Sequence, residues 1–208
     1  MKGRRGAYYT VVYPHSSPPP PQVYPHAYQD AISLFSYSMA DAPGRSYRYY
    51  TAPPSLGPPL VAFGEGQSYS TFAIACAPGG WSPDRSSINL ACNVSNPAGG
   101  MDGDEVLMAF HRPSAGVIAL VNGRHPLPLS ALVGFERVSV PAGGVAAVAL
   151  ALPAAAALAF VNEVGASVLY QGVHYIDIRN GNGFNQTVAL EVATTVTLRS
   201  PPLPPSGL

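Results

Sequence analysis

The sequence has few charged side chains. Only 11% of its 208 residues are Asp, Glu, Lys or Arg, well below the roughly 25% of an ordinary globular domain. The eleven basic residues balance the eleven acidic ones, so the chain has no excess of positive charge for binding a nucleic-acid backbone. We therefore expect no nucleic-acid partner.

Long apolar runs are also missing. The alanine-rich tract at residues 145–161 is interrupted by Pro153, and no segment reaches the roughly eighteen apolar residues of a membrane-spanning helix. The N-terminal cations Lys2, Arg4 and Arg5 are followed by GAYYTVVYPHSSPPPP, which lacks the apolar run of a secretory signal. We expect no membrane partner, and the sequence assigns this chain no location.

Cysteine is scarce, because the two residues Cys76 and Cys92 are too few for a disulfide framework and lack zinc-site spacing. Each lies in an alternating apolar segment, so both are expected to point inward. We interpret them as free core thiols. A cross-strand disulfide, which would need an oxidising compartment, stays open as the alternative. Asn93-Val94-Ser95 and Asn185-Gln186-Thr187 are glycosylation sequons, which matter only in a secreted chain.

No cofactor or metal site is predicted. The five histidines follow no metal-ligand spacing: His15, His26, His111, His125 and His174. The segment FGEGQSYSTF, residues 63–72, lacks the third glycine of a dinucleotide fingerprint and the closing glycine of a nucleophile elbow. We interpret Gly64 and Gly66 as a sharp turn, with Phe63, Tyr69 and Phe72 packing into a joint between two domains.

The densest acidic cluster is Asp102-Gly103-Asp104-Glu105. In an extended strand, Asp102 and Asp104 would share one face at about 6.6 Å, close to the carboxyl separation of an inverting glycosidase. A strand entrance on a convex sandwich offers no cleft for a sugar, so we interpret the cluster as a solvated turn and predict no catalytic residue. Trp81 is the best lone candidate for a carbohydrate-facing aromatic, although a loop residue folded onto the domain is the favoured interpretation.

The pattern of turns and alternating segments predicts an all-β fold. Residues 1–60 are rich in proline and tyrosine and are expected to be irregular. Strands are predicted from Thr71 onward: Thr71–Ala77, Ser87–Ser95, Glu105–Arg112, Phe135–Val140, Val145–Leu152, Ser167–Arg179 with a bend near Gly172, and Thr187–Leu198. About seven strands are typical of an immunoglobulin-like or fibronectin type III-like β-sandwich.

The sequence also predicts two connections between the strands and the orientation of Phe135. The alanines between Pro153 and Phe160 favour a short helical turn, and residues 113–130 are expected to form an irregular surface loop. Phe135 is expected to face the space between the sheets and Glu136 the solvent, so that removal of the Phe135 ring would cost about 3–5 kcal/mol.

Four ordered motifs resemble the C-terminal region of the family 3 glycoside hydrolases, of the β-xylosidase and β-glucosidase type. GRSYRYYT (residues 44–51) and FGEGQSYSTF resemble the family's G-R-T-Y-R-F/Y-Y and F-G-x-G-L-S-Y-T-T-F. Residues 94–106 resemble V-x-N-x-G-x-x-x-G-D-E-V, and residues 132–143 resemble L-x-G-F-x-R-V-x-L-x-x-G-E. The last two belong to the fibronectin type III-like domain of such enzymes.

The sequence departs from the family pattern in several places. Gln67 stands where leucine is usual, Gly144 replaces a common glutamate, and residues 1–20 match nothing in the family. The family's nucleophilic aspartate and general-acid glutamate have no matching position here. The resemblance therefore implies no catalytic, cofactor-binding or metal-binding residue, and a chain that is inactive alone.

The resemblance also implies a domain organisation and a role. Residues 1–20 are expected to be disordered, 21–67 to be a remnant of the second catalytic α/β domain and its linker, 68–200 to be the fibronectin type III-like domain, and 201–208 to be a tail. The implied role is structural support for a secreted parent enzyme that hydrolyses terminal β-linked sugars of polysaccharides such as xylan. The implied partners are the parent's catalytic domains.

Two alternatives remain at this point. The sandwich could instead be an independent module that binds polysaccharide or another protein, which an exposed coplanar aromatic pair would favour. The chain could also be a truncated gene product without a separate role. The motifs do not distinguish a xylosidase parent from a glucosidase parent.

Overall fold

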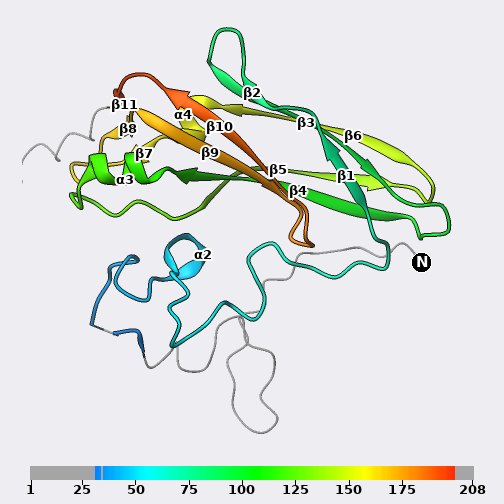
Figure 1. Ribbon diagram of the computed structural model, residues 1–208, viewed down its shortest axis with the longest axis horizontal. Coiled ribbons are helices and arrows are strands. Elements are labelled where there is room, and N and C mark those ends of the chain that lie inside the picture. The colour runs from blue at the N-terminus through cyan, green and yellow to red at the C-terminus, as the bar shows by residue number, and fades with distance from the viewer. Residues whose placement is uncertain (1–30, 34, 200–208) are drawn as a thin grey trace, which may run out of the picture.

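Short alternating segments from residue 73 onward pair into three antiparallel sheets (Figure 1). The computed structural model describes residues 31–33 and 35–199. The strands in this part of the chain are β1 Ala73–Cys76, β2 Gly80–Trp81, β3 Ser87–Ser95, β4 Gly103–Pro113, β5 Ala131–Val140, β6 Val145–Pro153, β7 Phe160–Val161, β8 Ser167–Leu169, β9 Gly172–Arg179, β10 Asn185–Val192 and β11 Val196–Arg199. The expected disorder of residues 1–20 and the expected tail at 201–208 concern residues outside this description.

Two four-stranded sheets form the sandwich. In sheet A, β3 pairs with β1 and β2 at one edge and with β6 at the other. Sheet B has the strand order β10-β9-β4-β5, and the three-stranded sheet C has the order β11-β8-β7. The predicted immunoglobulin-like, all-β fold is confirmed.

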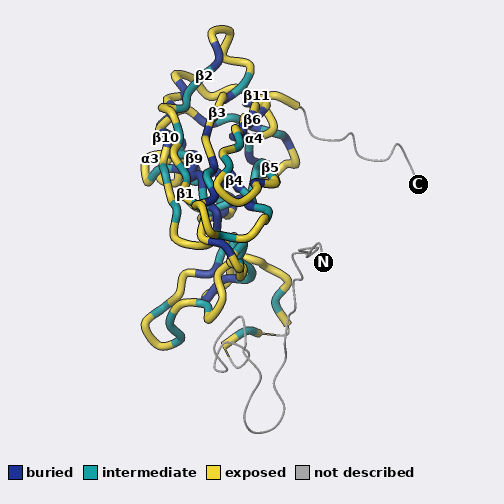
Figure 2. The backbone as a smooth tube through the Cα atoms, turned by 90° about the vertical axis from the view of Figure 1, so that its right-hand side faces the viewer, coloured by how far each residue is buried: buried dark blue, intermediate teal, exposed yellow. Residues whose placement is uncertain are grey.

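The main core lies between sheets A and B and follows from the two-residue alternation of the strands. Every second residue of β3 is buried, and β6 alternates in the same way (Figure 2). The buried apolar residues of sheets A and B include Ile88, Leu90, Val94, Val148, Leu150 and Leu152 from A, and Leu107, Ala109, Ile176, Ile178, Val188 and Leu190 from B. Each fully buried aliphatic side chain of this kind contributes about 1.5–3 kcal/mol.

Two short helices connect strands of the sandwich. The predicted helical turn in the alanine run is confirmed as α4, Ala154–Leu158. The expected irregular loop at 113–130 is wrong in part, because it contains α3, Ala115–Val121. The Ser114 side chain caps α3 by accepting a hydrogen bond from Val117 N, and Asn122 ends it with a left-handed backbone. In the described residues, no helix is long and apolar enough to cross a membrane.

Two of the predicted strands are each divided in the structure. The bend expected near Gly172 separates β8 from β9, where Gly172 has φ +124°. The long segment at 187–198 is split into β10 in sheet B and β11 in sheet C. The two-residue strands β2 and β7 were not predicted, because periodicity needs more than two residues to be visible.

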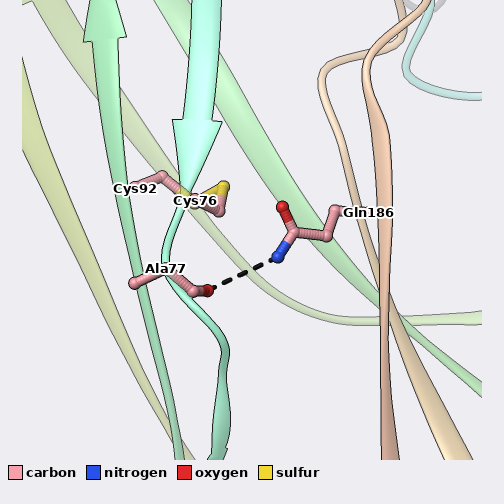
Figure 3. Close-up of a disulfide and its surroundings, with 4 residues drawn as sticks. All are labelled: Cys76, Ala77, Cys92 and Gln186. Carbon is pink, nitrogen blue, oxygen red and sulfur yellow. Dashed lines mark hydrogen bonds between the residues drawn. A yellow bond between two sulfur atoms is a disulfide. The ribbon is translucent and has the colours of Figure 1, made fainter.

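The expectation of free thiols is wrong, because Cys76 and Cys92 form a disulfide between β1 and β3 (Figure 3). The two residues are direct cross-strand partners in the antiparallel ladder. Beside the bridge, the Gln186 side chain of sheet B donates a hydrogen bond to the Ala77 carbonyl at 3.4 Å (Figure 3). Alternation showed that both cysteines face inward, but their pairing depends on a register that alternation does not fix.

The expected orientation of Phe135 is also wrong, because this side chain is 63% exposed. In β5, Val138 packs against the core and Val140 is buried. Gly134 faces inward as well, because a Cβ there would clash with the Leu152 side chain of sheet A. After the bulge, the inward residues of β5 thus include Gly134, Val138 and Val140, while Phe135 lies on the outer face of sheet B and Glu136 is exposed to solvent as expected.

β5 also contains a bulge, just before Phe135. Ala109 pairs with Gly134 whereas the next residue, Phe110, pairs with Leu132, so Val133 is the extra residue of β5. Val133 packs against the core although the regular alternation would direct it outward. A strand with one bulge has no single alternation, so the residues before and after Val133 follow different ones.

Leu107 and Phe135 provide a test of this register from adjacent strands. Phe135→Ala should change the free energy of unfolding by no more than about 0.5 kcal/mol, as expected at an exposed position. Leu107→Ala should lower it by about 2–5 kcal/mol, because Leu107 is fully buried and leaves a cavity. Urea denaturation of the three proteins measures both changes, and a larger loss at Phe135 than at Leu107 would contradict the register.

Candidate functional site

The N-terminal described segment, residues 31–67, lies along the outer face of sheet B (Figure 1). It contains the short helix α2, Ser46–Tyr49. Met108 and Phe110 of β4 point to this outer face, since their neighbours Leu107 and Ala109 belong to the core between the sheets. Met108 and Phe110 are nevertheless almost completely buried, so the N-terminal segment covers them.

Three aromatic rings form the centre of this contact. The rings of Tyr47 and Phe63 stack with centroids 3.9 Å apart. Both rings pack edge-on against Phe110, each at 6.0 Å. The Tyr47 hydroxyl also accepts a hydrogen bond from the Leu132 backbone N–H at 3.1 Å, which fixes α2 to the start of β5. We call Tyr47, Phe63 and Phe110 the aromatic clamp.

A close approach of two backbones extends the clamp. Gly64 follows Phe63 with φ +88°, and Gly181 in the β9–β10 turn has φ +75°. A Cβ on Gly181 would clash with the Gly64 carbonyl group, and a Cβ on Gly64 would clash with the Met108 side chain. Glycine is therefore required at both positions. The turn expected at Gly64 is confirmed, whereas Gly66 has open space around it.

The other aromatic expectations are met only in part. Phe63 packs at the joint as expected, but Tyr69 is 93% exposed and Phe72 packs against the core of the sandwich. Tyr50 is buried within the N-terminal segment and donates a hydrogen bond to the Gly57 carbonyl at 2.7 Å. Trp81 lies in β2 instead of a turn and packs partly buried against the core.

A buried carboxylate lies on the same outer face of sheet B. Asp177 is only 2% exposed and accepts hydrogen bonds from three side chains. Arg112 Nε lies 3.1 Å from its Oδ2, Arg179 Nη2 lies 2.8 Å from its Oδ2, and Thr187 Oγ1 lies 2.7 Å from its Oδ1. Burial acts to raise the pKa of Asp177, but the hydrogen bonds and charges of its partners outweigh it and hold the pKa below its ordinary value.

The two arginines connect this carboxylate with aromatic rings. The Arg179 guanidinium lies 5.2 Å above the Phe110 ring, and the Arg112 guanidinium lies 4.5 Å above the Tyr175 ring. The network therefore continues directly into the aromatic clamp. Alternation in β9 places Tyr175, Asp177 and Arg179 on one face. The pairing of Asp177 with Arg112 is not visible in the sequence, because Arg112 comes from another strand.

The predicted acidic cluster has a structural role in this arrangement. Asp104 pairs with Arg137 of β5, whose Nε lies 3.0 Å from its Oδ2, and also accepts from Ser139 Oγ. Asp102 accepts a hydrogen bond at 2.8 Å from the backbone N–H of Ala142 in the β5–β6 turn. Both carboxylates thus tie the start of β4 to β5 and its turn.

Searches for similar proteins returned glycoside hydrolases. No family model matches the chain. "Probable beta-glucosidase J" of Neosartorya fischeri is 31% identical over 150 residues, which cover 69% of this chain and 16% of that protein. "Exo-1,4-beta-xylosidase xlnD" of Aspergillus oryzae is 25% identical over 181 residues, which cover 76% of this chain and 21% of that protein.

Solved structures show the same fold. A β-glucosidase from Kluyveromyces marxianus in complex with glucose matches 68% of this chain with a TM-score of 0.57 and 20% identity, and the match covers 16% of that enzyme. A β-glucosidase from Listeria innocua matches 70% of this chain with a TM-score of 0.56 and 22% identity, covering 19% of that enzyme. The chain spans only 16% to 25% of the length of the curated relatives.

The chain is thus related to a small part of each of these enzymes, and its ordered motifs identify that part. It belongs to the C-terminal region of the family 3 glycoside hydrolases. Two family 3 motifs that are distant in the sequence meet in the structure, because Asp104 of the first pairs with Arg137 of the second. Asn96 of the first motif donates from Nδ2 to the Val140 carbonyl at 3.1 Å.

The family 3 motifs upstream supply two of the three rings of the aromatic clamp. GRSYRYYT contributes Tyr47, and FGEGQSYSTF contributes Phe63 and Gly64. The structure therefore gives these motifs a packing role between the N-terminal segment and the fibronectin-like sandwich. In the described residues, Tyr47 anchors this segment to sheet B through Phe110 and the Leu132 backbone N–H.

Buried histidines of this family 3 region lie at the end of the sandwich near α3. His174 Nε2 lies 2.8 Å from the Tyr170 carbonyl, which can only accept, so Nε2 carries the proton. His174 Nδ1 must then accept from His111 Nε2 at 2.9 Å. Burial lowers the pKa of His111 to about 3 and also lowers the pKa of His174. Both rings are therefore neutral near pH 7. Among the described residues, no cluster could hold a metal ion.

The aromatic clamp can be tested with two matched substitutions. Phe63→Ala should lower the free energy of unfolding by about 1–3 kcal/mol and speed proteolytic cleavage within residues 31–67, since a stacked ring and its buried area are lost. Tyr69→Ala, six residues later at an exposed position, should leave both unchanged. Guanidinium melts and timed proteolysis with mass spectrometry measure the two effects. Equal cleavage rates for the two variants would contradict the clamp.

The histidine pair should make stability depend on pH in one direction. The folded pKa of His111 lies below its unfolded value of about 6.5, so the unfolded chain binds the proton first as the pH falls. The stability that comes from keeping the histidine neutral in the folded state is fully present above about pH 6.5. Below that pH the free energy of unfolding falls by up to about 1.4 kcal/mol for each pH unit per histidine. His111→Gln keeps a donor toward His174 and removes one titrating ring.

The measurement is the free energy of unfolding between pH 7 and pH 4.5. The range ends above the ordinary pKa of carboxylates such as Asp177, so their titration contributes little there. The wild-type curve should fall more steeply than that of His111→Gln. Parallel curves would show that His111 does not carry the pH dependence.

Proposed function

We propose that this chain is a non-catalytic supporting region of a glycoside hydrolase that removes terminal β-linked sugars from polysaccharides. The observation that carries the proposal is the aromatic clamp, which attaches a family 3 segment to the outer face of the fibronectin-like sheet B. A sandwich with this attachment can hold an adjoining catalytic domain in a fixed position. The similarity to a probable β-glucosidase and to an exo-1,4-β-xylosidase supports a β-glucosidase or β-xylosidase parent.

The position of the carboxylates supports a non-catalytic role. A retaining glycosidase needs a nucleophilic carboxylate and a protonated carboxylic acid about 5–5.5 Å apart across the sugar. Asp104 and Asp177 instead pair with arginines, and Asp102 accepts from a backbone N–H. Of two pockets in the described residues, one is lined by a single carboxylate, Asp41, and the other by none. By resemblance, the catalytic aspartate and glutamate belong to parts of the family without a counterpart in this sequence.

The outer face of sheet B is suited to a permanent contact. Its buried carboxylate is neutralised by two arginines, so the face can be covered without leaving an isolated charge in a dry interface. Large apolar side chains remain exposed on the N-terminal segment and on β5, namely Phe35, Tyr37, Leu60 and Phe135. We propose that the catalytic domains of the parent enzyme cover these side chains. The disulfide is consistent with a secreted parent.

Lack of turnover by the chain alone is the first expected result. The purified chain should release no chromophore from aryl β-glucosides or aryl β-xylosides, with the full-length Neosartorya fischeri relative as the positive control. Turnover that survives rigorous purification and disappears in Asp104→Asn would overturn the non-catalytic proposal. Turnover that stays with the chain through every purification step in that variant would overturn the proposal equally, whereas turnover that separates from the chain identifies a contaminating hydrolase.

The supporting role needs a separate comparison. The matching region of the Neosartorya fischeri relative can be removed or replaced by residues 31–199 of this chain, and the half-life of each protein is measured at elevated temperature. The enzyme that carries residues 31–199 of this chain should have a longer half-life than the truncated enzyme. The same hybrid with Tyr47→Ala and Phe63→Ala should have the short half-life of the truncated enzyme. Reinsertion of the relative's own region is the control for the junctions. A gain that survives both substitutions would contradict the role of the clamp.

A further inference from the structure

The outer face of sheet A carries small, uncharged side chains. Because the inward positions of β1, β3 and β6 fill the core, the remaining positions point away from sheet B and from residues 31–67 (Figure 1). Nine of these outward residues are exposed, and none of the nine is charged: Ala73, Ala75, Asn89, Ala91, Asn93, Val145, Ala147, Ala149 and Ala151. Contiguous exposed apolar patches of this kind usually have an occupant.

Asn93 lies among these small residues. Its cross-strand partner on β1 is Ala75, and its partner on β6 is Ala147. Both neighbours are exposed alanines, so nothing bulky on this face hinders a large group attached to the Asn93 side chain. Asn93-Val94-Ser95 is also the first of the two N-glycosylation sequons of the chain.

The disulfide provides an independent observation about the compartment. Cys92, the residue before Asn93, is bonded to Cys76. Disulfides of this kind form and persist in oxidising compartments, which include the endoplasmic reticulum, where sequons are glycosylated. The sequon and the disulfide therefore point to the same cellular route.

We propose that Asn93 is an N-glycosylation site and that its glycan covers the outer face of sheet A. The donor is a lipid-linked oligosaccharide pyrophosphate. A bond forms between the Asn93 amide nitrogen and the anomeric carbon of the first sugar, while the bond from that carbon to the pyrophosphate oxygen breaks. The lipid pyrophosphate leaves with the electron pair, and the amide proton goes to a base of the transferase. No oxidation or reduction is involved.

The structure also indicates when this transfer takes place. In the folded chain, the Ser95 hydroxyl of the sequon donates a hydrogen bond at 3.2 Å to the Ala73 carbonyl of β1. The backbone around Asn93 is paired with strands on both sides. Transfer therefore precedes the pairing of β1, β3 and β6, and the folded sheet then displays the glycan on its exposed face.

The site lies on the face opposite the proposed catalytic-domain contact. Residues 31–67 cover the outer face of sheet B, and the glycan would lie on sheet A across the core (Figure 1). A glycan at Asn93 is thus compatible with the supporting role but does not depend on it. Failure of the supporting role would leave the glycosylation result unchanged.

Site mapping tests the modification. The full chain is secreted from a eukaryotic host behind an added signal peptide and digested with a peptide N-glycosidase. Release should lower the mass and convert the Asn93 side chain to a carboxylate, which peptide mass spectrometry locates. Asn93→Gln and Ser95→Ala should each remove this glycan. Asn89→Gln, on the same face of β3 outside any sequon, and Asn185→Gln should both retain it. Secreted, folded chain without a glycan at Asn93 would overturn the proposal.

Self-association tests the covering role. Light scattering of the folded protein is compared for the glycosylated chain, Asn93→Gln and Asn89→Gln. If the glycan covers the alanine face, Asn93→Gln should associate at about tenfold lower concentration than the other two. Ser95→Ala should behave as Asn93→Gln does, which separates loss of the glycan from loss of the asparagine. Equal association of all four proteins would overturn the covering role.

Discussion

The two faces of each strand impose the constraint on which the rest of this structure depends. Packing sheets A and B together requires one apolar side chain at every second position, and the opposite face of each sheet is then free to specialise. On sheet B the free face carries the Asp177 network and Phe110, and Tyr47 and Phe63 of the N-terminal segment pack against Phe110. On sheet A it carries alanines and Asn93. A single core thus positions two surfaces with different chemistry on opposite sides of the domain.

The contact on sheet B combines apolar packing with a neutralised charge. The rings of Tyr47, Phe63 and Phe110 exclude water from the joint, while two arginines satisfy the Asp177 carboxylate beside them. A buried carboxylate without such partners would cost several kcal/mol, so the arginines are a condition for covering this face. The backbone contact at Gly64 and Gly181 leaves no space for a side chain. These features suit a contact that stays closed.

The family 3 motifs have structural meaning in this region. Asp104 and Arg137 come from separate motifs and join β4 to β5, while Asn96 binds the carbonyl of Val140 at the end of β5. In a chain related to glycosidases, the Gly-, Asp- and Glu-rich motif at residues 94–106 could be taken for a catalytic site. Here the same residues fix strand ends and turns, because each carboxylate has an arginine or a backbone N–H as its partner.

The sequence alone determined the fold class, the inward positions of β3 and β6, the helical turn at α4 and the family, because alternation and ordered motifs are local properties. Tertiary structure decided what depends on register. The pairing of β5 with β4 placed Phe135 outside, strand pairing brought Cys76 to Cys92, and Arg112 reached Asp177 from a neighbouring strand. Alternation shows which residues share a face of one strand, but only strand pairing shows which residues of other strands lie beside them.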